Sequence, residues 1–329
     1  MTLEDLAQGL RESRGVAHKR DISVMMETLA RNAPTGARSS TVLVGDDCAA
    51  IPDGDGWLLF AIEGFINELV ERDPWFAGWC GVMVNVSDVF AMGGRPIAVV
   101  DALWSNGTER AVPILEGMSA AASAYGVPIV GGHTNGRNES EQLAVAILGR
   151  SQHLLTSFDA KPGNVLIAAI DLRGSYRDPY PFWDAATTAD PTRLRGDLEV
   201  LTSLADLGLC VAAKDISNAG VVGTALMLFE CSGVGGVIDV RAVPRPHNVP
   251  DTKWLLSTFP SYGFLLAAPE QNVPQIRARF AARGIAGAVI GRCDDTGVAR
   301  VTDGGREATI WDFGTTAFIG CGPQAEIRR

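Results

Sequence analysis

The segment VNVSDVFAMGGRP, residues 84–96, constrains the fold and chemistry of this chain more than any other. It reads as the end of an apolar helix over residues 75–92, in which Asn85 and Asp88 lie three positions apart and therefore on one helical face. A Gly-Gly pair and a proline then end the helix. A carboxylate among valine and phenylalanine neighbours needs a cation or several donors to compensate its charge. We therefore expect Asp88 to face a buried cation.

Length and composition predict a globular protein with two domains. The chain has 329 residues, of which 47% are hydrophobic and 20% charged, enough to build two separate cores. Its net charge of −10 opposes a nucleic-acid surface, because phosphate backbones select basic patches. An acidic protein can still bind a nucleotide through Mg²⁺. The expected partner is therefore a small molecule, with no nucleic acid.

The cysteines and the N-terminal residues predict a cytoplasmic protein. The 6 cysteines are scattered without a CxxC pair and without a histidine at zinc-ligand spacing, so we expect reduced thiols and no structural zinc. Residues 1–15 read as an amphipathic helix, not as a signal peptide. No run approaches ~18 apolar residues, so no membrane span is expected.

The order of predicted elements indicates a mixed α/β (α+β) fold in two similar halves. A turn-rich stretch at 156–164 is the expected junction, which predicts an N-terminal domain over 1–155 and a C-terminal domain over 156–329. In the N-terminal half the expected helices cover 1–32 with a break at 14–15, 75–92 and 109–125, and the expected strands cover 41–52, 57–65, 96–104, 127–135 and 143–150.

Acidic residues recur at the ends of predicted strands and helices. They are Asp46 and Asp47 in GDDCAAI, Glu63 in AIEGF, Asp88, and Asp215 in KDISNAG. Taken singly, Asp46 or Asp47 could be a turn residue and Asp215 a helix N-cap. Taken together, hard oxygen ligands at the ends of elements favour Mg²⁺ that holds phosphates.

Two further features could contact an anion. Gly131, Gly132, His133 and Thr134 follow a predicted buried strand, and a Gly-Gly turn there could form a nest of backbone N–H groups. His133 is either a catalyst or an ordinary satisfied polar residue. Lys19 in AHKRD could reach phosphates or could be a solvated lysine. Neither a P-loop nor a GxGxxG motif occurs in the chain.

An ordered set of motifs resembles the aminoimidazole ribonucleotide (AIR) synthetase superfamily over about residues 40–290. The motifs are GDDCAAI, VNVSDVFAMGGRP, VGGHT, AKPGN, KDISNAGVVGTAL and SYGFLLAA. The resemblance implies an α/β N-terminal domain, an α+β C-terminal domain and a homodimer whose N-terminal sheets form a barrel at the interface. It also implies binding of ATP with Mg²⁺, and transfer of phosphate to a substrate or its transient installation there.

The likeness is strongest to selenophosphate synthetase, over RDPWFAGWCGVMVNVSDVFAMGGRP and at the histidine after Gly-Gly. It implies catalytic roles for Lys19, His133 and Asp215. The implied Mg²⁺ ligands are Asp46, Asp47, Glu63, Asp88 and Asp215. The implied nucleotide contacts are Asn85, Gly131, Gly132, Thr134 and Lys19.

Several departures leave the substrate open. Selenophosphate synthetase has a cysteine or selenocysteine near its N-terminus, whereas the first cysteine here is Cys48. Thiamine-monophosphate kinase has an Asp-Gly pair where this chain has DISNAG, and the hydrogenase maturation dehydratase carries its substrate on a C-terminal cysteine, whereas Cys321 precedes the end by 8 residues. Residues 173–195 match none of these relatives and read as a substrate-specific lid or as a surface excursion packed by aromatic residues.

The sequence therefore predicts a Mg²⁺- and ATP-dependent phosphotransferase or synthetase that acts on a small molecule. Phosphotransfer like that of thiamine-monophosphate kinase is the alternative within enzymes. A nucleotide-binding protein without turnover is the alternative outside them.

Overall fold

The structure is a computed structural model that describes residues 2–31 and 44–322. The chain forms two compact units, each built from separate stretches of sequence. Unit 1 comprises Met1–Asp46, Leu155–Ala185 and Leu207–Arg329, and unit 2 comprises Asp47–Leu154 and Ala186–Asp206. Residues 186–206, from the second half of the sequence, thus belong to unit 2. The domain division expected between residues 155 and 156 stays a prediction.

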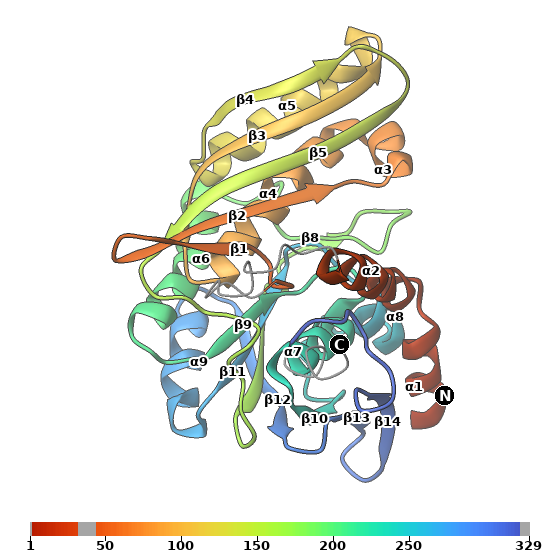
Figure 1. The fold of residues 1–329 in the computed structure, drawn as a ribbon, viewed down its shortest axis with the longest axis vertical. Coiled ribbons are helices and arrows are strands. Elements are labelled where there is room, and N and C mark those ends of the chain that lie inside the picture. Colours follow the sequence, from red (N-terminus) through yellow and green to blue (C-terminus); the bar gives the residue numbers. More distant parts are fainter. Residues whose placement is uncertain (1, 32–43, 323–329) are drawn as a thin grey trace. The chain divides into compact units, whose positions relative to one another are not determined.

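Unit 2 contains a five-stranded sheet in the order β1-β2-β5-β3-β4 (Figure 1). Its strands are β1 (Ala49–Asp53), β2 (Gly56–Gly64), β3 (Arg95–Asn106), β4 (Ile129–Asn135) and β5 (Arg137–Ser151). Neighbouring strands are antiparallel except β3 and β4, which are parallel and joined through helix α5 (Thr108–Tyr125). A parallel pair needs such a crossover because a tight turn cannot connect it.

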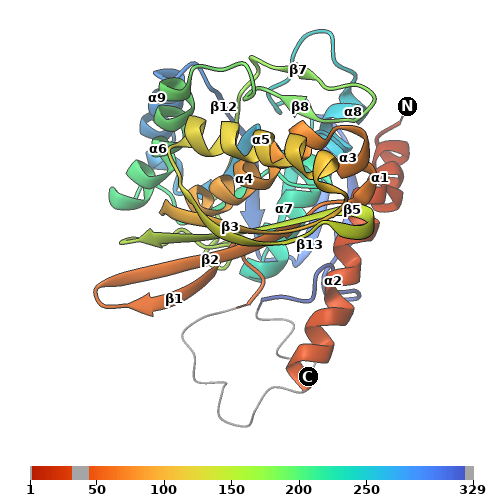
Figure 2. The same ribbon diagram turned by 90° about the horizontal axis from the view of Figure 1, so that it is seen from above.

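Helices α4 (Pro74–Ala91) and α5 cover one face of this sheet, and the short α3 (Asn67–Arg72) precedes them (Figure 2). The predicted helices over 75–92 and 109–125 are confirmed to within one residue at each end. Pro74 opens α4 at its first position, and Gly93 follows its end with a φ of 75°. Val82, Val86 and Val89 are fully buried, which fixes the face that α4 turns inward.

The opposite face of the sheet carries exposed apolar side chains. Ile51, Phe60, Ile62 and Val100 are 40–65% exposed, and the strand register places them on one face; we call these four residues the open sheet face. An exposed apolar face of this kind is a candidate surface for binding another protein. Within the described part of this single chain the five strands form an open sheet. The barrel implied by the resemblance needs the sheet of a second subunit and stays a prediction.

Helix α6 (Pro191–Asp206) belongs to unit 2 although it lies in the second half of the sequence. The Arg195 guanidinium donates to the Ala124 carbonyl at 2.8 Å, and the Thr202 hydroxyl donates to the Gly94 carbonyl at 3.1 Å. Its exposed Glu199 also pairs with Arg95 through two guanidinium nitrogens. These contacts attach α6 to α5 and to the turn after α4.

Unit 1 contains a seven-stranded sheet in the order β14-β13-β10-β12-β6-β11-β9. The strands are β6 (Val165–Ile170), β9 (Ala212–Asp215), β10 (Gly235–Asp239), β11 (Gly263–Ala268), β12 (Ala286–Asp294), β13 (Val298–Thr302) and β14 (Glu307–Asp312). All neighbours are antiparallel except β10 and β13. The residues of β6 and β11 are buried throughout, so these strands form the centre of the unit.

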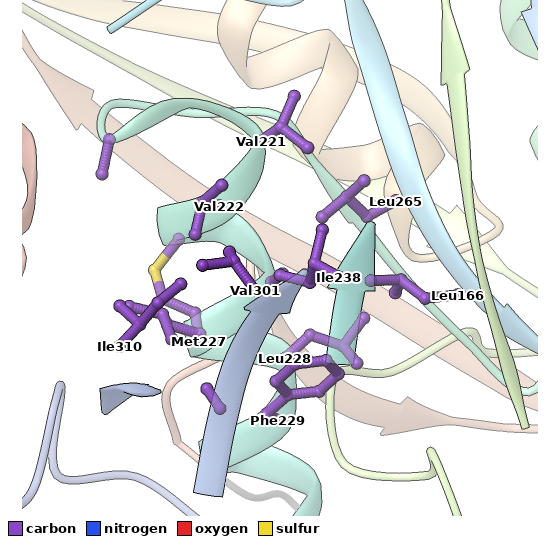
Figure 3. Close-up of a cluster of buried hydrophobic side chains, with 14 of the residues drawn as sticks. Leu166, Val221, Val222, Met227, Leu228, Phe229, Ile238, Leu265, Val301 and Ile310 are labelled. Carbon is purple, nitrogen blue, oxygen red and sulfur yellow. The ribbon is translucent and has the colours of Figure 1, made fainter. Parts of the chain in front are cut away.

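Helix α7 (Gly220–Ser232) is apolar on every side and fills the core of unit 1. Figure 3 shows part of this core, where side chains of α7 lie together with Ile238 of β10 and Val301 of β13. The remaining helices of the unit are α1 (Leu3–Glu12), α2 (Arg14–Arg31), α8 (Asp251–Leu256) and α9 (Val273–Ala281), with a 3₁₀ turn η2 at Glu270–Asn272. Leu3, Leu6 and Leu10 of α1 are buried, as their spacing predicted.

The segment 173–195 is divided between the two units. Its first part forms a small hairpin of β7 (Ser175–Tyr176) and β8 (Trp183–Asp184) in unit 1, and its last residues begin α6 in unit 2. Tyr176 shares a 2.7 Å hydrogen bond with Thr258, and the rings of Tyr176 and Trp183 pack edge-on against Trp254. The hairpin is therefore packed by aromatic residues, as the second of the two interpretations proposed.

The 6 cysteines are all buried and none forms a disulfide. No helix within the described ranges combines the length and the apolar character needed to cross a membrane.

Candidate functional site

Two of the predicted metal ligands lie close together in unit 2. Carboxylate oxygens of Asp47 and Asp88 lie within 4.8 Å of each other. Asp88 is on α4 and only 4% exposed, while Asp47 is half-buried just before β1. Two negative charges at this separation, one of them buried, repel strongly unless a cation lies between them. The pair therefore has the charge and the ligand chemistry of a divalent-cation site.

Asn85 lies one helical turn before Asp88 and is fully buried. Its amide nitrogen donates to the main-chain carbonyls of Gly81 at 2.8 Å and Val145 at 2.9 Å, which uses both N–H groups. Its amide oxygen has no hydrogen-bond partner. Because phosphate oxygens are acceptors, the expected phosphate contact of Asn85 does not fit this geometry. The free oxygen can instead accept from a metal-bound water or bind a metal.

Glu63 and Asp101 flank this position on the sheet. Val145 on β5 pairs directly with Glu63 on β2 and with Asp101 on β3, so the three side chains share the face that α4 covers. Burial raises the pKa of the Asp101 carboxyl, and one of its oxygens has no hydrogen-bond partner. We did not predict a role for Asp101, although a lone acid in the apolar strand VVDALW is a signal that could have identified it.

Gly131, Gly132, His133 and Thr134 lie within the exposed strand β4. The expectation of a buried strand followed by a Gly-Gly anion nest is therefore wrong, because these residues pair with β3 in extended conformation. A side chain at Gly132 would require the Asp101 carboxylate to shift, because its Cβ would lie 2.2 Å from an Asp101 carboxylate oxygen.

His133 does not join the Asp47–Asp88 pair. It pairs with Ala102, two residues beyond Val100 of the open sheet face, and its ring contacts Trp104 with the ring centroids 6.4 Å apart. Residues paired across strands share a face, so the His133 side chain lies on the side of the sheet opposite α4. Its predicted catalytic role stays a prediction, because Asp88 lies on α4 and the His133 side chain lies on the other face of the sheet.

Asp215 is the last residue of β9 in unit 1 and is 2% exposed. The following helix α7 has Ala219 as its N-cap, so the alternative in which Asp215 caps that helix is wrong. The chain between β9 and α7 turns at Ala219, a non-glycine residue with a φ of 99°. A buried carboxylate at a strand end remains suited to a metal ligand.

Lys19 lies on α2, whose first turn contacts the chain just before α7. A Cβ at Gly15 would lie 2.6 Å from the Ala219 backbone, so α2 and this part of the chain are in close contact. Lys19 follows Gly15 by four residues and therefore lies on the same side of α2. The half-buried Lys19 lies one helical turn beyond this contact, within unit 1.

Asp46 is bound by groups that the sequence did not single out. Its carboxylate accepts hydrogen bonds from the Ser157 N–H at 2.7 Å and the Ser157 hydroxyl at 2.5 Å. The ammonium group of Lys214 lies 3.7 Å from a carboxylate oxygen of Asp46, and both side chains are buried. Asp46 is therefore engaged in a protein network, which favours an anchoring role over the predicted role as a metal ligand.

Comparisons with known proteins identify the family. Residues 45–151 match the N-terminal domain model of AIR synthase related proteins, and residues 161–304 match the C-terminal domain model. Uncharacterized protein sll0787 from Synechocystis sp. is 44% identical over 319 residues, which cover 97% of this chain and 98% of that protein.

Solved structures share the fold. PurL from T. maritima in complex with ADP aligns with a TM-score of 0.71 at 21% identity over 94% of this chain, which spans 53% of the PurL chain. AaThiL complexed with AMPPCP and TMP aligns with a TM-score of 0.65 at 18% identity, over 87% of this chain and 96% of that one. With both domain models matched in order and a relative similar over its whole length, the chain belongs to the AIR synthase related protein family.

Proposed function

We propose that this protein is a Mg²⁺-dependent enzyme that uses ATP to phosphorylate a small molecule or to activate it through a phosphorylated intermediate. The observation that carries the proposal is the close, partly buried pair Asp47–Asp88 inside the matched N-terminal family domain. Structural relatives in complex with ADP or AMPPCP support the nucleotide half of the proposal.

Asp47 and Asp88 are the proposed ligands of Mg²⁺, with the free oxygen of Asn85 available to a metal-bound water. When bound, Mg²⁺ neutralises charge on the β- and γ-phosphates. Buried, preorganised ligands perform this task without rearranging during the reaction. Asp215 is proposed as a further ligand on the strength of the sequence motif alone, and the same holds for Glu63.

Lys19 is the proposed cationic contact of the phosphates or of the substrate. It lies on the side of α2 that meets the turn at Ala219, and a lysine ammonium supplies up to three donors to anionic oxygens. The start of α7 adds backbone N–H groups, which favour anions at a helix N-terminus. The acceptor of the phosphate is a small molecule whose identity we leave open.

A homodimer formed through the open sheet face is also part of the proposal. Phe60 is 49% exposed and Ile62 is 65% exposed, and burying these side chains against a second copy removes apolar surface from water. His133 lies on the same side of the sheet, so in such a dimer it would lie at or near the interface.

ATP hydrolysis in the presence of Mg²⁺ and a panel of small-molecule acceptors tests the proposal. We expect turnover by the wild type and its loss in Asp88→Asn, with Asp55→Asn as the control because Asp55 is an exposed acid of the same unit. Tight Mg²⁺-dependent ATP binding with no turnover on any acceptor would favour the nucleotide-binding protein without catalysis. Turnover unchanged in Asp88→Asn would remove the proposed metal role.

A further inference from the structure

A buried network within unit 1 links two segments that carry proposed metal ligands. The Asp46 carboxylate accepts from the Ser157 backbone and hydroxyl, and the Lys214 ammonium lies 3.3 Å from the same hydroxyl. Ser157 is held in turn by Ser232, whose hydroxyl donates to the Ser157 carbonyl at 2.7 Å. The network thus joins the chain before β1, the segment after β5, strand β9 and the end of α7.

Burying the charged groups of this network costs free energy, because they lose their contact with water. The side chains of Lys214 and Asp46 are 4% and 2% exposed, so each has lost most of its water, and each compensates part of the other's charge. Replacing a buried ion pair by apolar residues is often neutral or stabilising, so stability alone gives a weak reason for keeping one. The presence of the ion pair is better explained if it holds the backbone segments that it joins in fixed positions.

Each member of the ion pair is covalently adjacent to a proposed ligand. Asp46 immediately precedes Asp47, and Lys214 immediately precedes Asp215. Neighbouring Cα atoms are about 3.8 Å apart across a trans peptide, so a shift in Asp46 or Lys214 is passed directly to the next residue. The ion pair therefore holds in place the residue directly before each of these two proposed ligands.

We infer that Lys214 is a positioning residue for the metal site, acting through Asp46 and Ser157 on the backbone that carries Asp47. The inference rests on the proposed function, because it assigns Lys214 a task at that site. Lys214 itself does not bind the metal, since an ammonium group has no lone pair to offer. Outer partners of metal ligands commonly change metal affinity by about 10- to 100-fold when they are removed.

Mn²⁺ titration of the full chain, followed by electron paramagnetic resonance, tests the inference with Mn²⁺ as the probe. We expect Lys214→Met to weaken Mn²⁺ affinity by about tenfold or more and to broaden the spectrum of the bound ion. Lys214→Arg, which keeps the charge, should recover most of the affinity. Lys161→Met is the matched control, because Lys161 is an exposed lysine of the same unit.

Asp46→Asn and the double variant Asp46→Asn/Lys214→Met test whether the two residues act together. If Lys214 acts through Asp46, the double variant binds Mn²⁺ no more weakly than the poorer single variant. Independent, additive losses would contradict that route. Thermal unfolding without metal, recorded on every variant, separates loss of fold from loss of affinity.

The outcomes separate failure of the inference from failure of the proposed function. Wild-type affinity in folded Lys214→Met, alongside loss of binding in Asp88→Asn, overturns the inference alone. Wild-type Mn²⁺ affinity in Asp88→Asn overturns the proposed metal site, and with it both the proposed function and the inference. If Lys214→Met does not fold, Ser157→Ala decides: weaker Mn²⁺ binding supports the positioning role and unchanged binding refutes it.

Discussion

The side-chain amide of Asn85 on α4 donates a 2.9 Å hydrogen bond to the main-chain carbonyl of Val145 on β5. Through this contact the residue that was expected to meet phosphates instead attaches the central helix of unit 2 to its sheet. Asp88, one turn further along, is thereby fixed relative to β5. The amide oxygen is left free on the buried side of the helix.

Asn85→Ala should lower the free energy of unfolding by about 2–3 kcal/mol, because two buried hydrogen bonds are lost and the Val145 carbonyl is left without this donor. Urea unfolding followed by circular dichroism gives the value. Asn67→Ala, at an exposed position on α3, is the control and should change stability by less than about 0.5 kcal/mol. Equal, small effects of the two substitutions would show that the Asn85 contact does not stabilise the fold.

Glu230 anchors the C-terminal part of unit 1. Its buried carboxylate accepts backbone N–H groups from Phe318 at 2.7 Å, Ile319 at 2.6 Å and Gly320 at 3.2 Å. Glu230→Gln replaces one acceptor oxygen by a donor, so we expect a loss of about 2–4 kcal/mol in the free energy of unfolding. Urea unfolding measures it, with the exposed Glu116→Gln as control. A loss no larger than the control's would contradict this anchoring role.

Asp101 gives a prediction for the dependence of stability on pH. Burial raises the pKa of its carboxyl, so the folded protein keeps this proton at pH values where the unfolded chain has lost it. The stability contributed by this group is therefore fully present below the ordinary pKa of 3.8 and is lost as the pH rises through the raised pKa.

Asp101→Asn removes that titration. Relative to the wild type, the variant should become more stable, with a larger positive free energy of unfolding, as the pH rises from below 3.8 to 7. Chemical unfolding at a series of pH values measures the difference, with Asp55→Asn, a substitution at an exposed position of the same unit, as the control. A parallel pH dependence in wild type and Asp101→Asn would be the contrary result.

The open sheet face predicts a homodimer that a single charge can disrupt. Wild-type protein should have twice the mass of the monomer in light scattering after size exclusion. Ile62→Lys should shift it to the monomer, because Ile62 is 65% exposed on that face and a lysine there would have to be buried in the dimer. Val112→Lys, on the exposed side of α5, should leave the mass unchanged. A monomeric wild type, or a dimer in both variants, would refute this interface.

The sequence predicted elements well where local signals agree with tertiary packing. The apolar run of α4 lies between Pro74 and Gly93, so both ends of the helix are visible without the structure. The pairing of Asp47 with Asp88 could also be anticipated, because both are acids in small-residue or apolar contexts. The place of α6 in unit 2 could not be predicted, since the contact of Arg195 with Ala124 joins residues distant in sequence.

Two features of the structure could not be predicted, for one physical reason. Gly131 and Gly132 resemble a turn, but pairing with β3 extends them, and Gly132 is small because Asp101 lies against it. Asp46 resembles a metal ligand, but its partner Ser157 lies 111 residues away and Lys214 further still. Long-range partners of a polar residue leave no mark beside it in the sequence, so local patterns do not indicate which groups it contacts.

Calorimetric titration of ATP into wild type and Asp88→Asn, with and without Mg²⁺, tests the central claim most directly. The account predicts that the wild type binds ATP only when Mg²⁺ is present, and that Asp88→Asn weakens this binding by at least about tenfold, or about 1.4 kcal/mol. Tight ATP binding that needs no Mg²⁺, or that Asp88→Asn leaves unchanged, would contradict it.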